Sequence, residues 1–590
     1  MINILPTHAT SFRAFGWVQD PSNFRSLCDV VAIFDENSKK HNDLKDTIIP
    51  RLVEERDGKD RLLKSMDSRP LKLSYLDLVG TSFMPRGSAR CNGIVQATVI
   101  GQVREFISDW PADNFVRWAY AFGFIKYNYS DDTFEITEKG LELSLAKTLG
   151  DDLNEIEKEL LTTAILAYPP AVRILRLLSE NEGTHLTKFE IGKQLGFIGE
   201  DGFTSLPQSV LVRELAITDD AKEKNKMKAD WDGSSDKYAR MTSKWLAKLG
   251  LVIQKPKRIT VTIADETYTE TIGQAYIISA SGISALNRTI GKSKHKRIAK
   301  NVCFEMLATK GSDREYLRTR RTYILKFISE NKGEIRYDEV KEKLKQVAFE
   351  ESIETIKADL KGLINLGLNI QVYANSCIWN DEINEFTLPL TQNLTKSSLT
   401  EIKEEIRPYI THISHEYLSL IDLAYDSKQN RLFEMKTLEL LIDECEYNGL
   451  HLGGSRKPDG IIYTSEDAEN YGVIIDTKAY SKGYSLPISQ ADEMERYIRE
   501  NQTRDDEVNP NEWWNNFDNR ISKHYFMFIS GHFIGNYKSQ IERISRNTNT
   551  RGTSLNVKNL LLCANLYKAG ELTHHSIGEK INNSYEFVLQ

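Results

Sequence analysis

Long apolar runs are absent from this 590-residue sequence, and none of its segments is long enough to span a bilayer. The opening segment MINILPTHATSFRAF also lacks the charged start and continuous apolar stretch of a signal peptide. The six cysteines lie far apart without any C-x-x-C pair, so neither a zinc site nor a disulfide framework is indicated. We therefore expect a cytoplasmic protein with no membrane partner, whose cysteines are scattered small apolar residues.

An excess of basic residues is absent too. The net charge of −7 argues against a protein that coats nucleic acid uniformly. It leaves room for local basic faces, because phosphate attraction acts within a Debye length of about 8–10 Å. Two basic clusters occur, at 292–300 and at 314–321. Composition alone slightly favours a solvated helix face over a DNA-binding surface for each.

The first 390 residues repeat one order of predicted elements, three short helices followed by a strand pair. The clearest example begins at 168–197, where apolar residues recur at helical spacing after a proline start and an Asn-Glu-Gly break follows. Thr187 with Glu190 three residues later predicts a capping box at the next helix. A third helix follows in SSDKYARMTSKWLAKLGLV, and RITVTIADETYTETIGQAYIIS then alternates like a hairpin. This order is that of a winged helix-turn-helix.

A similar order occurs at 318–380, and a weaker version ends at 114–143. Three successive units suggest a modular DNA-binding region, although winged helices also serve as protein-interaction modules. A polar stretch near 387–400 is typical of a linker, and the remainder alternates helical and strand patterns. We expect subdomains at 1–150, 151–295 and 296–388, a linker at 389–398 and a final α/β domain at 399–590.

The candidate catalytic residues lie in the segment 451–484. Asp459 lies in a Pro-Asp-Gly turn that opens the strand GIIYT, and the chain returns as YGVIIDTKAY. Alternation along that strand places Asp476 and Lys478 on one face, about 6–7 Å apart at ~3.3 Å per residue. If the two strands pair, Asp459 reaches the same corner. Two carboxylates and a lysine suit Mg²⁺-assisted hydrolysis of a phosphodiester.

Other D-x-K or E-x-K triplets are present, at 43–45, 359–361 and 401–403. They lie on predicted helices, where residues i and i+2 do not share a face. Only Asp476-Thr477-Lys478 ends an apolar strand, so spacing favours a nuclease site there over an incidental surface hairpin. Glu434, on an upstream predicted helix, is a candidate additional acid, with a surface position as the equally good alternative.

The same segment resembles the cleavage domain of the FokI-like type IIS restriction endonucleases, in HLGGSRKPDGIIYT, YGVIIDTKAYSKGYSLPISQADEMERYIRENQTR and SGHFIGNYKSQ. Upstream blocks, including FGWVQDP, YPPAVRIL, HLTKFEIGKQLGF, GFTSLP and WDGSSDKYARM, resemble the recognition region of that family in matching order. The resemblance implies a multidomain α+β protein, with three winged helix-turn-helix subdomains followed by an α/β PD-(D/E)xK nuclease domain. It implies a type II site-specific deoxyribonuclease that binds an asymmetric site in double-stranded DNA and cuts both strands at a fixed distance downstream.

The resemblance implies Asp459, Asp476 and Lys478 as the catalytic set, with Asp459 and Asp476 as ligands of Mg²⁺, in agreement with the strand pattern. The expectations that follow come only from the resemblance. Two cleavage domains are expected to pair on DNA as a transient homodimer through the helix at 489–501, with Asp492 and Arg496 as salt-bridging residues. A bacterial host with a cognate DNA methyltransferase that protects its own sites is also implied.

The resemblance also assigns residues that contact DNA bases: Gln19, Asp20, Arg86, Gln102, Trp110, Asp232, Lys237 and Arg240. Arg and Lys pair with guanine and Gln with adenine. The sequence departs from the family pattern at Asp20 and Ala229, where Asn is expected, and at Asp232, where Glu is expected. The family site GGATG is therefore the default expectation, and each changed contact carries roughly 1–3 kcal/mol of discrimination.

Two alternatives remain open at this point. One is a metal-dependent nuclease that serves DNA repair or junction processing. The other is a winged-helix DNA-binding regulator with an inactive nuclease-like domain, against which the intact Asp459, Asp476 and Lys478 set counts.

Overall fold

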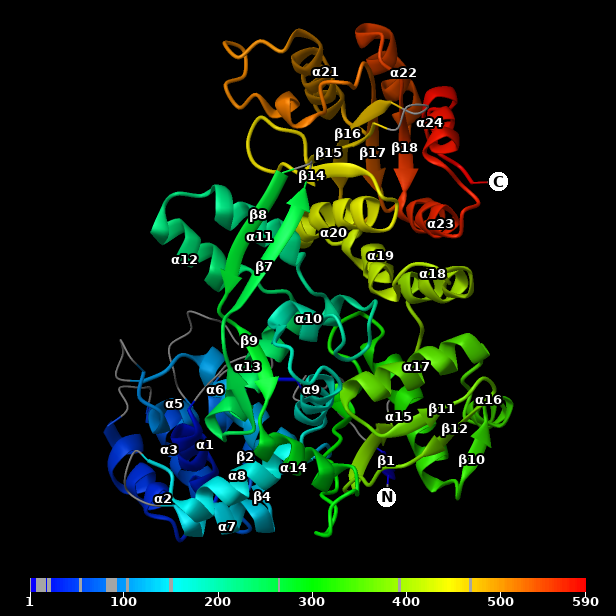
Figure 1. Cartoon of the computed structure of the whole chain (residues 1–590). Helices are drawn as coiled ribbons and strands as arrows, with labels where there is room; N and C mark the ends of the chain where they lie inside the picture. The colour runs from blue at the N-terminus through cyan, green and yellow to red at the C-terminus, as the bar shows by residue number, and fades with distance from the viewer. Residues whose placement is uncertain are drawn as a thin grey trace. The chain divides into compact units, whose positions relative to one another are not determined.

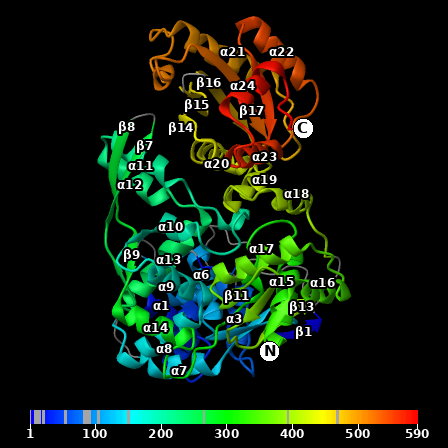
Figure 2. The ribbon, with the colours of Figure 1, turned by 45° about the vertical axis from the view of Figure 1, so that its right-hand side comes forward.

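The computed structural model describes residues 2–6, 17–18, 23–51, 56–80, 93–101, 106–147, 152–263, 266–390, 394–465 and 470–589. The chain forms two compact units, shown in Figures 1 and 2. The first contains residues 1–197, 237–255 and 274–396, and the second contains 198–236, 256–273 and 397–590. The second unit therefore combines the predicted nuclease region with two segments from the middle of the chain.

Three small antiparallel sheets in the first unit share one topology. Their strand orders are β2-β4-β3, β5-β9-β6 and β10-β12-β11, so the last strand in sequence always lies in the middle. Each sheet closes a set of short helices, which is the winged-helix arrangement expected from the sequence. The fold class is confirmed in this respect.

The first of these sets spans residues 24–146. Its elements are α1 (Phe24–Ala32), α2 (Lys39–Asp43), α3 (Arg56–Met66), β2 (Leu73–Ser74), α4 (Tyr75–Val79), α5 (Ile94–Thr98), α6 (Asp109–Ala121), β3 (Ile125–Asn128), β4 (Thr133–Ile136) and α7 (Glu138–Ala146). Trp118 of α6 is buried in its core.

The second set lies within 155–289. In the first unit it comprises α8 (Glu155–Ala167), α9 (Pro169–Glu180), β5 (Leu186–Thr187), α10 (Lys188–Gly192), most of α13 (Ser234–Lys248), β6 (Val252–Gln254), β9 (Ala275–Ile278) and α14 (Ala280–Thr289). The Thr187 hydroxyl accepts a hydrogen bond from the amide of Glu190, and the Glu190 carboxylate accepts one from the amide of Thr187, so the predicted capping box is present. The proline start at 169 and the helix end near Asn181 are also confirmed.

The third set comprises α15 (Arg314–Glu330), β10 (Glu334–Arg336), α16 (Tyr337–Gln346), α17 (Ile353–Leu366), β11 (Ile370–Val372) and β12 (Ser376–Trp379). The basic cluster at 314–321 does not form the exposed basic face that the sequence predicted. Arg318, Arg320 and Arg321 point inward and are at most 3% exposed, because carboxylates and backbone carbonyls pair with them. In the other cluster, which is not helical, Lys300 is fully buried and pairs with Asp381 at 2.5 Å.

The strand β13 (Phe386–Leu390) runs parallel to β1 (Ile2–Pro6). The expected linker at 389–398 thus begins inside β13 and ends on the first residue of α18 (Ser398–Ile406).

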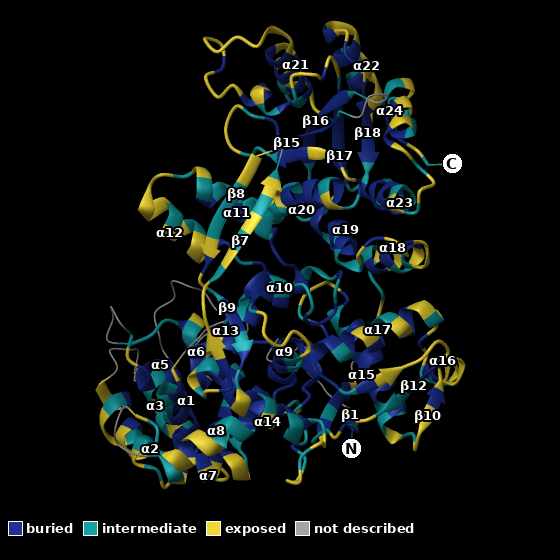
Figure 3. Ribbon diagram, viewed as in Figure 1, coloured by how far each residue is buried: buried dark blue, intermediate teal, exposed yellow. Residues whose placement is uncertain are grey.

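A five-stranded mixed sheet forms the centre of the second unit. Its order is β14-β15-β16-β17-β18, with antiparallel pairing at the first two contacts and parallel pairing at the last two. The strands are β14 (Asn448–His451), β15 (Gly460–Thr464), β16 (Tyr471–Lys478), β17 (Lys523–Ser530) and β18 (Gly552–Asn556). Figure 3 shows the central strands as buried, which places β16 between two cores.

Helices cover both faces of this sheet. Helices α19 (Ser419–Leu423), α20 (Asn430–Asp443), α23 (Val557–Lys568) and α24 (His574–Asn583) share a core with Val473 and Ile475. Helices α21 (Ile488–Thr503) and α22 (Tyr537–Thr548) share the opposite core with Ile474. The predicted alternation along β16 is therefore confirmed. The helical part of the chain at 399–446 consists of several short helices, one break being the single turn Arg407–Tyr409 around Pro408.

The two middle segments of the second unit contribute α11 (Gln208–Ile217), α12 (Ala221–Asp230) and the hairpin β7 (Lys257–Ile263) with β8 (Glu266–Ile272). Within the described part of the chain no single helix has the length and apolar character to cross a membrane, and only α8 with α9, bent by 83°, passes that test as a pair.

Candidate active site

Strand pairing brings the predicted catalytic residues to one end of the central sheet. Asp476 and Lys478 are the last residues of one face of β16. In the antiparallel pair β15–β16, Gly460 lies opposite Ile475. Asp459, the residue before Gly460, therefore lies beside the same end of β16. The structure brings the three residues together as the spacing predicted.

Asp459 is held by the residue that separates the other two. Its Oδ2 accepts hydrogen bonds from the Thr477 amide at 2.6 Å and from the Thr477 hydroxyl at 2.9 Å. Its backbone carbonyl accepts from the amides of Leu452 and Gly453, which follow β14. Thr477, which was not expected from the sequence, therefore holds Asp459 in place. Its hydroxyl meets Asp459 only when β15 and β16 pair in this register, so the sequence carries no local signal for the contact.

Asp476 and Lys478 form a shielded ion pair, with 2.7 Å between Lys478 Nζ and Asp476 Oδ1. Burial and the neighbouring Asp459 carboxylate raise the pKa of Asp476 well above its ordinary value. Burial, with the charge of Glu434 second, also raises the pKa of Asp459. Burial alone would lower the pKa of Lys478, but the carboxylates of Asp476 and Asp459 hold it above its ordinary value.

Glu434 lies on α20, near enough to act electrostatically on Asp459. Its Oε2 is 3.2 Å from His451 Nε2, and His451 ends β14. The glutamate is therefore partly buried beside the site, which disfavours a simple surface role. His451 was not expected from the sequence.

The donor set fits a hard divalent cation bound with few protein ligands. The negative charge of Asp459 raises the pKa of the buried Asp476 carboxyl, so a cation held by both carboxylates would relieve that repulsion. The described residues contain no cluster of three or more His, Cys, Asp or Glu side chains suited to a metal. A cation here would complete its shell with water and substrate phosphate oxygens, which is the way Mg²⁺ is usually bound.

Four of the expected base-contacting residues, Gln19, Asp20, Arg86 and Gln102, lie outside the described residues. Trp110 is on the first turn of α6 and 40% exposed. Lys237 and Arg240 lie one turn apart on α13, both half-buried, and Asp232 precedes that helix.

The predicted pairing helix is α21. Its apolar residues Met494, Tyr497 and Ile498 pack into the core beneath it, so the opposite, polar face of the helix takes no part in that core. Asp492 and Arg496 lie one turn apart with side chains 59% and 43% exposed. Within the chain Asp492 pairs with Arg543 at 2.6 Å, and Arg496 pairs with Glu493 at 3.2 Å.

Fold and site together define a multidomain protein whose winged-helix region is joined to an α/β domain of nuclease type. Family models of FokI match in order: recognition domain subdomain 1 at 13–146, recognition domain subdomain 2 at 157–294, the D3 domain at 307–375 and the cleavage domain at 396–588.

Full-length relatives agree. The chain is 46% identical over 580 residues to the type II restriction enzyme FokI of Planomicrobium okeanokoites, covering 97% of this chain and 99% of that one. It is 33% identical over 589 residues to the type II restriction enzyme StsI of Streptococcus sanguinis, covering 97% and 96%.

Solved structures agree as well. A structure of the restriction endonuclease FokI superposes with a TM-score of 0.89 at 46% identity, covering 98% of this chain and all of that one. A structure of FokI bound to DNA gives 0.90 at 45% identity with the same coverage. The chain belongs to the FokI family of type II restriction endonucleases. DNA binding and dependence on a divalent metal ion are general to this class of enzyme.

Proposed function

We propose that this enzyme binds a short asymmetric site in double-stranded DNA and cuts both strands at a fixed distance downstream, through Asp459, Asp476 and Lys478. The observation that carries the proposal is the meeting of two carboxylates and one lysine, Asp476 buried and the other two half-buried, at the end of β16. No other D-x-K or E-x-K triplet discussed above has this environment, since those at 43–45, 359–361 and 401–403 lie on helical segments.

Each residue has a separate task. Asp459 and Asp476 hold Mg²⁺, which when bound offsets negative charge on the phosphate under attack and helps generate hydroxide. Thr477 fixes one oxygen of Asp459, and the other oxygen would be left to hold the cation. Lys478, whose raised pKa keeps it protonated at neutral pH, stabilises the developing charge or orients the attacking water. Glu434, oriented by His451, is the candidate for a further acid.

Recognition is assigned to the region before residue 389. Lys237 and Arg240 project from one helix at the spacing that presents both to the same groove, and Trp110 is exposed. GGATG stays the default site. The departures from the family pattern at Asp20, Ala229 and Asp232 are the positions from which a shift of the preferred sequence would arise.

Two chains are proposed to act together, because one chain carries one catalytic set and a duplex has two strands. Asp492 and Arg496, on the exposed face of α21, are the proposed contacts of this transient homodimer. A cognate methyltransferase that protects the host's own sites follows from this activity, as does a cytoplasmic location, where the bacterial chromosome lies.

Incubation of a plasmid with the protein and Mg²⁺, followed by sequencing of the new ends, tests the proposal. Ends at a constant offset from one short sequence are expected. Random nicking would indicate a repair or junction nuclease instead, and retarded but uncut DNA would indicate a regulator with an inactive nuclease domain.

The residue assignment needs its own test. Asp459→Ala and Lys478→Ala should each abolish cutting and leave the affinity for DNA unchanged. Lys482→Ala is the matched control, because Lys482 is an exposed lysine four residues beyond Lys478. Cleavage at the wild-type rate by either active-site variant would refute the assignment.

A further inference from the structure

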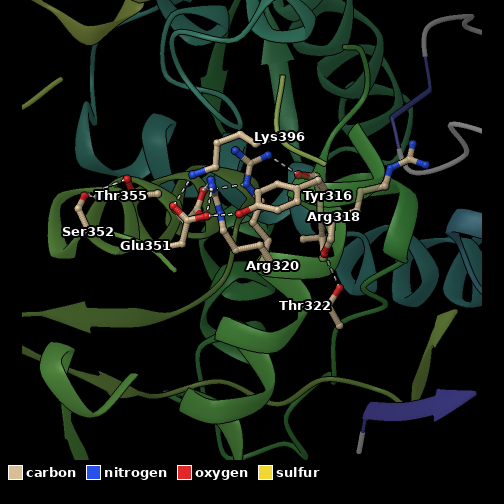
Figure 4. A network of polar contacts seen from close by, with 11 residues as sticks. Tyr316, Arg318, Arg320, Thr322, Glu351, Ser352, Thr355 and Lys396 are labelled. Carbon is tan, nitrogen blue, oxygen red and sulfur yellow. Dashed lines mark hydrogen bonds and ion pairs between the residues drawn. The ribbon is translucent and has the colours of Figure 1, made fainter. Parts of the chain in front are cut away.

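The side chain of Lys396, the residue at which the match to the cleavage domain begins, contacts the third winged-helix subdomain. Lys396 Nζ donates to Glu351 Oε2 at 2.9 Å, and it lies 5.5 Å from the centroid of the Tyr316 ring. Figure 4 shows the Lys396 side chain reaching toward the Glu351 carboxylate. The Glu351 side chain is only 1% exposed, so the lysine reaches a carboxylate that water barely contacts.

Glu351 is a rigid attachment point. It directly precedes Ser352, the N-cap of α17, whose hydroxyl accepts from the Thr355 amide. Its Oε1 accepts from the Tyr316 hydroxyl at 2.5 Å and from Arg320 Nη1 at 3.1 Å. Among the described residues, Lys396 alone donates to the other oxygen, Oε2. Loss of the lysine would therefore leave a buried carboxylate oxygen without a donor, which favours the attached state.

The buried charges around Glu351 balance one another without Lys396. Arg320 and Arg321 already balance Asp359 and Glu351, with all four side chains at most 4% exposed. The lysine, at 18% exposed, is a fifth charge at the edge of a cluster that is neutral without it. Its contribution is thus to fix the chain rather than to neutralise the core.

Lys396 lies between β13 of the recognition region and α18 of the cleavage domain, so its contact with Glu351 fixes the chain close to the start of α18. The last residue of β13 is Leu390, and Lys396 follows six residues later. Ser397 caps α18 through the Thr400 amide, and the helix begins at Ser398. With Lys396 attached, only one residue separates the recognition region's anchor from the first helix of the cleavage domain.

We propose that Lys396 is a positioning residue that determines the cut offset, by keeping the tether between recognition region and cleavage domain at its minimum length. This inference rests on the proposed function. Release of Lys396 moves the start of the free tether back to Leu390. Six residues span up to about 20 Å at 3.3–3.6 Å each. At 3.4 Å per base along a DNA strand, that length corresponds to at most about six base pairs.

The test compares cut positions of three variants on DNA with one recognition site. Lys396→Met removes the ammonium group and keeps the length of the side chain, whereas Lys396→Arg keeps a donor for Glu351. Lys361→Met, at an exposed position on α17, is the matched control. Sequencing of both ends should show that Lys396→Met spreads or displaces the cuts by one to six base pairs. Lys396→Arg and Lys361→Met should cut where the wild type cuts.

Each other outcome overturns the inference. If Lys396→Met cuts at the same positions as the wild type, the inference is wrong, whether its cleavage rate is unchanged or faster. Loss of DNA binding by Lys396→Met, measured by gel shift, would show that the lysine only supports the fold of the subdomain. If the wild type itself has no constant offset, the proposed function fails instead, so the two failures are distinguishable.

Discussion

The replacement of Thr477 by valine isolates one hydrogen bond of the active site. Valine preserves the branched shape that suits β16 and keeps the backbone amide, so Asp459 Oδ2 retains its 2.6 Å bond and loses only the 2.9 Å bond from the hydroxyl. Hydrogen bonds to a charged group contribute about 1.5–3 kcal/mol. If this bond serves mainly to orient Asp459 in the transition state, its loss slows the chemical step by about 10- to 150-fold.

Single-turnover cleavage with saturating protein and Mg²⁺ measures that step directly. DNA affinity should be unchanged, because Thr477 is 5% exposed and lies in the cleavage domain. Thr464→Val is the control: Thr464 is equally buried at the end of β15 and pairs with Tyr471, at the opposite end of β16 from Asp476.

Two results would refute this argument. If Thr477→Val cuts at the wild-type rate, the hydroxyl does not position Asp459. If Thr464→Val is slowed equally, the effect comes from weakening the sheet and not from the active site.

Three further predictions concern the metal, the dimer and the buried ion pairs. Chelation of divalent ions should stop cleavage while gel shifts still show bound DNA, and added Mg²⁺ should restore cutting; activity that persists in chelator contradicts the metal site. Asp492→Ala combined with Arg496→Ala should slow cleavage at low protein concentration without weakening DNA binding, because both residues lie on α21 of the cleavage domain; normal cutting would show that the pairing face is misplaced. Asp359→Asn should destabilise the third subdomain by about 3–5 kcal/mol, since Arg320 and Arg321 lose their shared carboxylate, and a denaturant midpoint equal to that of the wild type would refute this. Burial would raise the pKa of Asp359, but the two arginines hold it below its ordinary value, so its stabilising contribution is present above about pH 4 and is lost as the pH falls further.

Elements with a local signal were predictable from the sequence. The capping box at Thr187, the helix that begins at Pro169 and the alternation along β16 depend on neighbours a few residues away. The proximity of Asp459 to Asp476 was also predictable, because a strand-turn-strand unit joins them across a short separation in sequence.

Features that depend on distant partners were not predictable. The sequence suggests a basic surface at Arg318, Arg320 and Arg321. Only the fold brings the acceptors that allow these side chains to be buried, the carboxylate of Asp359 and the carbonyl of Ala308. The pairing of β1 with β13 has no local signature. The hydroxyl of Thr477 acquires its role only when the neighbouring strand is in register.

The parallel pair of β1 and β13 has a consequence for biosynthesis. Residues 2–6 can meet residues 386–390 only after nearly two thirds of the chain has been translated. At about 5–20 residues per second, Lys478 is translated roughly 4–18 seconds after Leu390. The last strand needed to close the recognition region is thus always synthesised before the catalytic residues. A nascent chain on the ribosome therefore has all the segments that select DNA before it has the means to cut it.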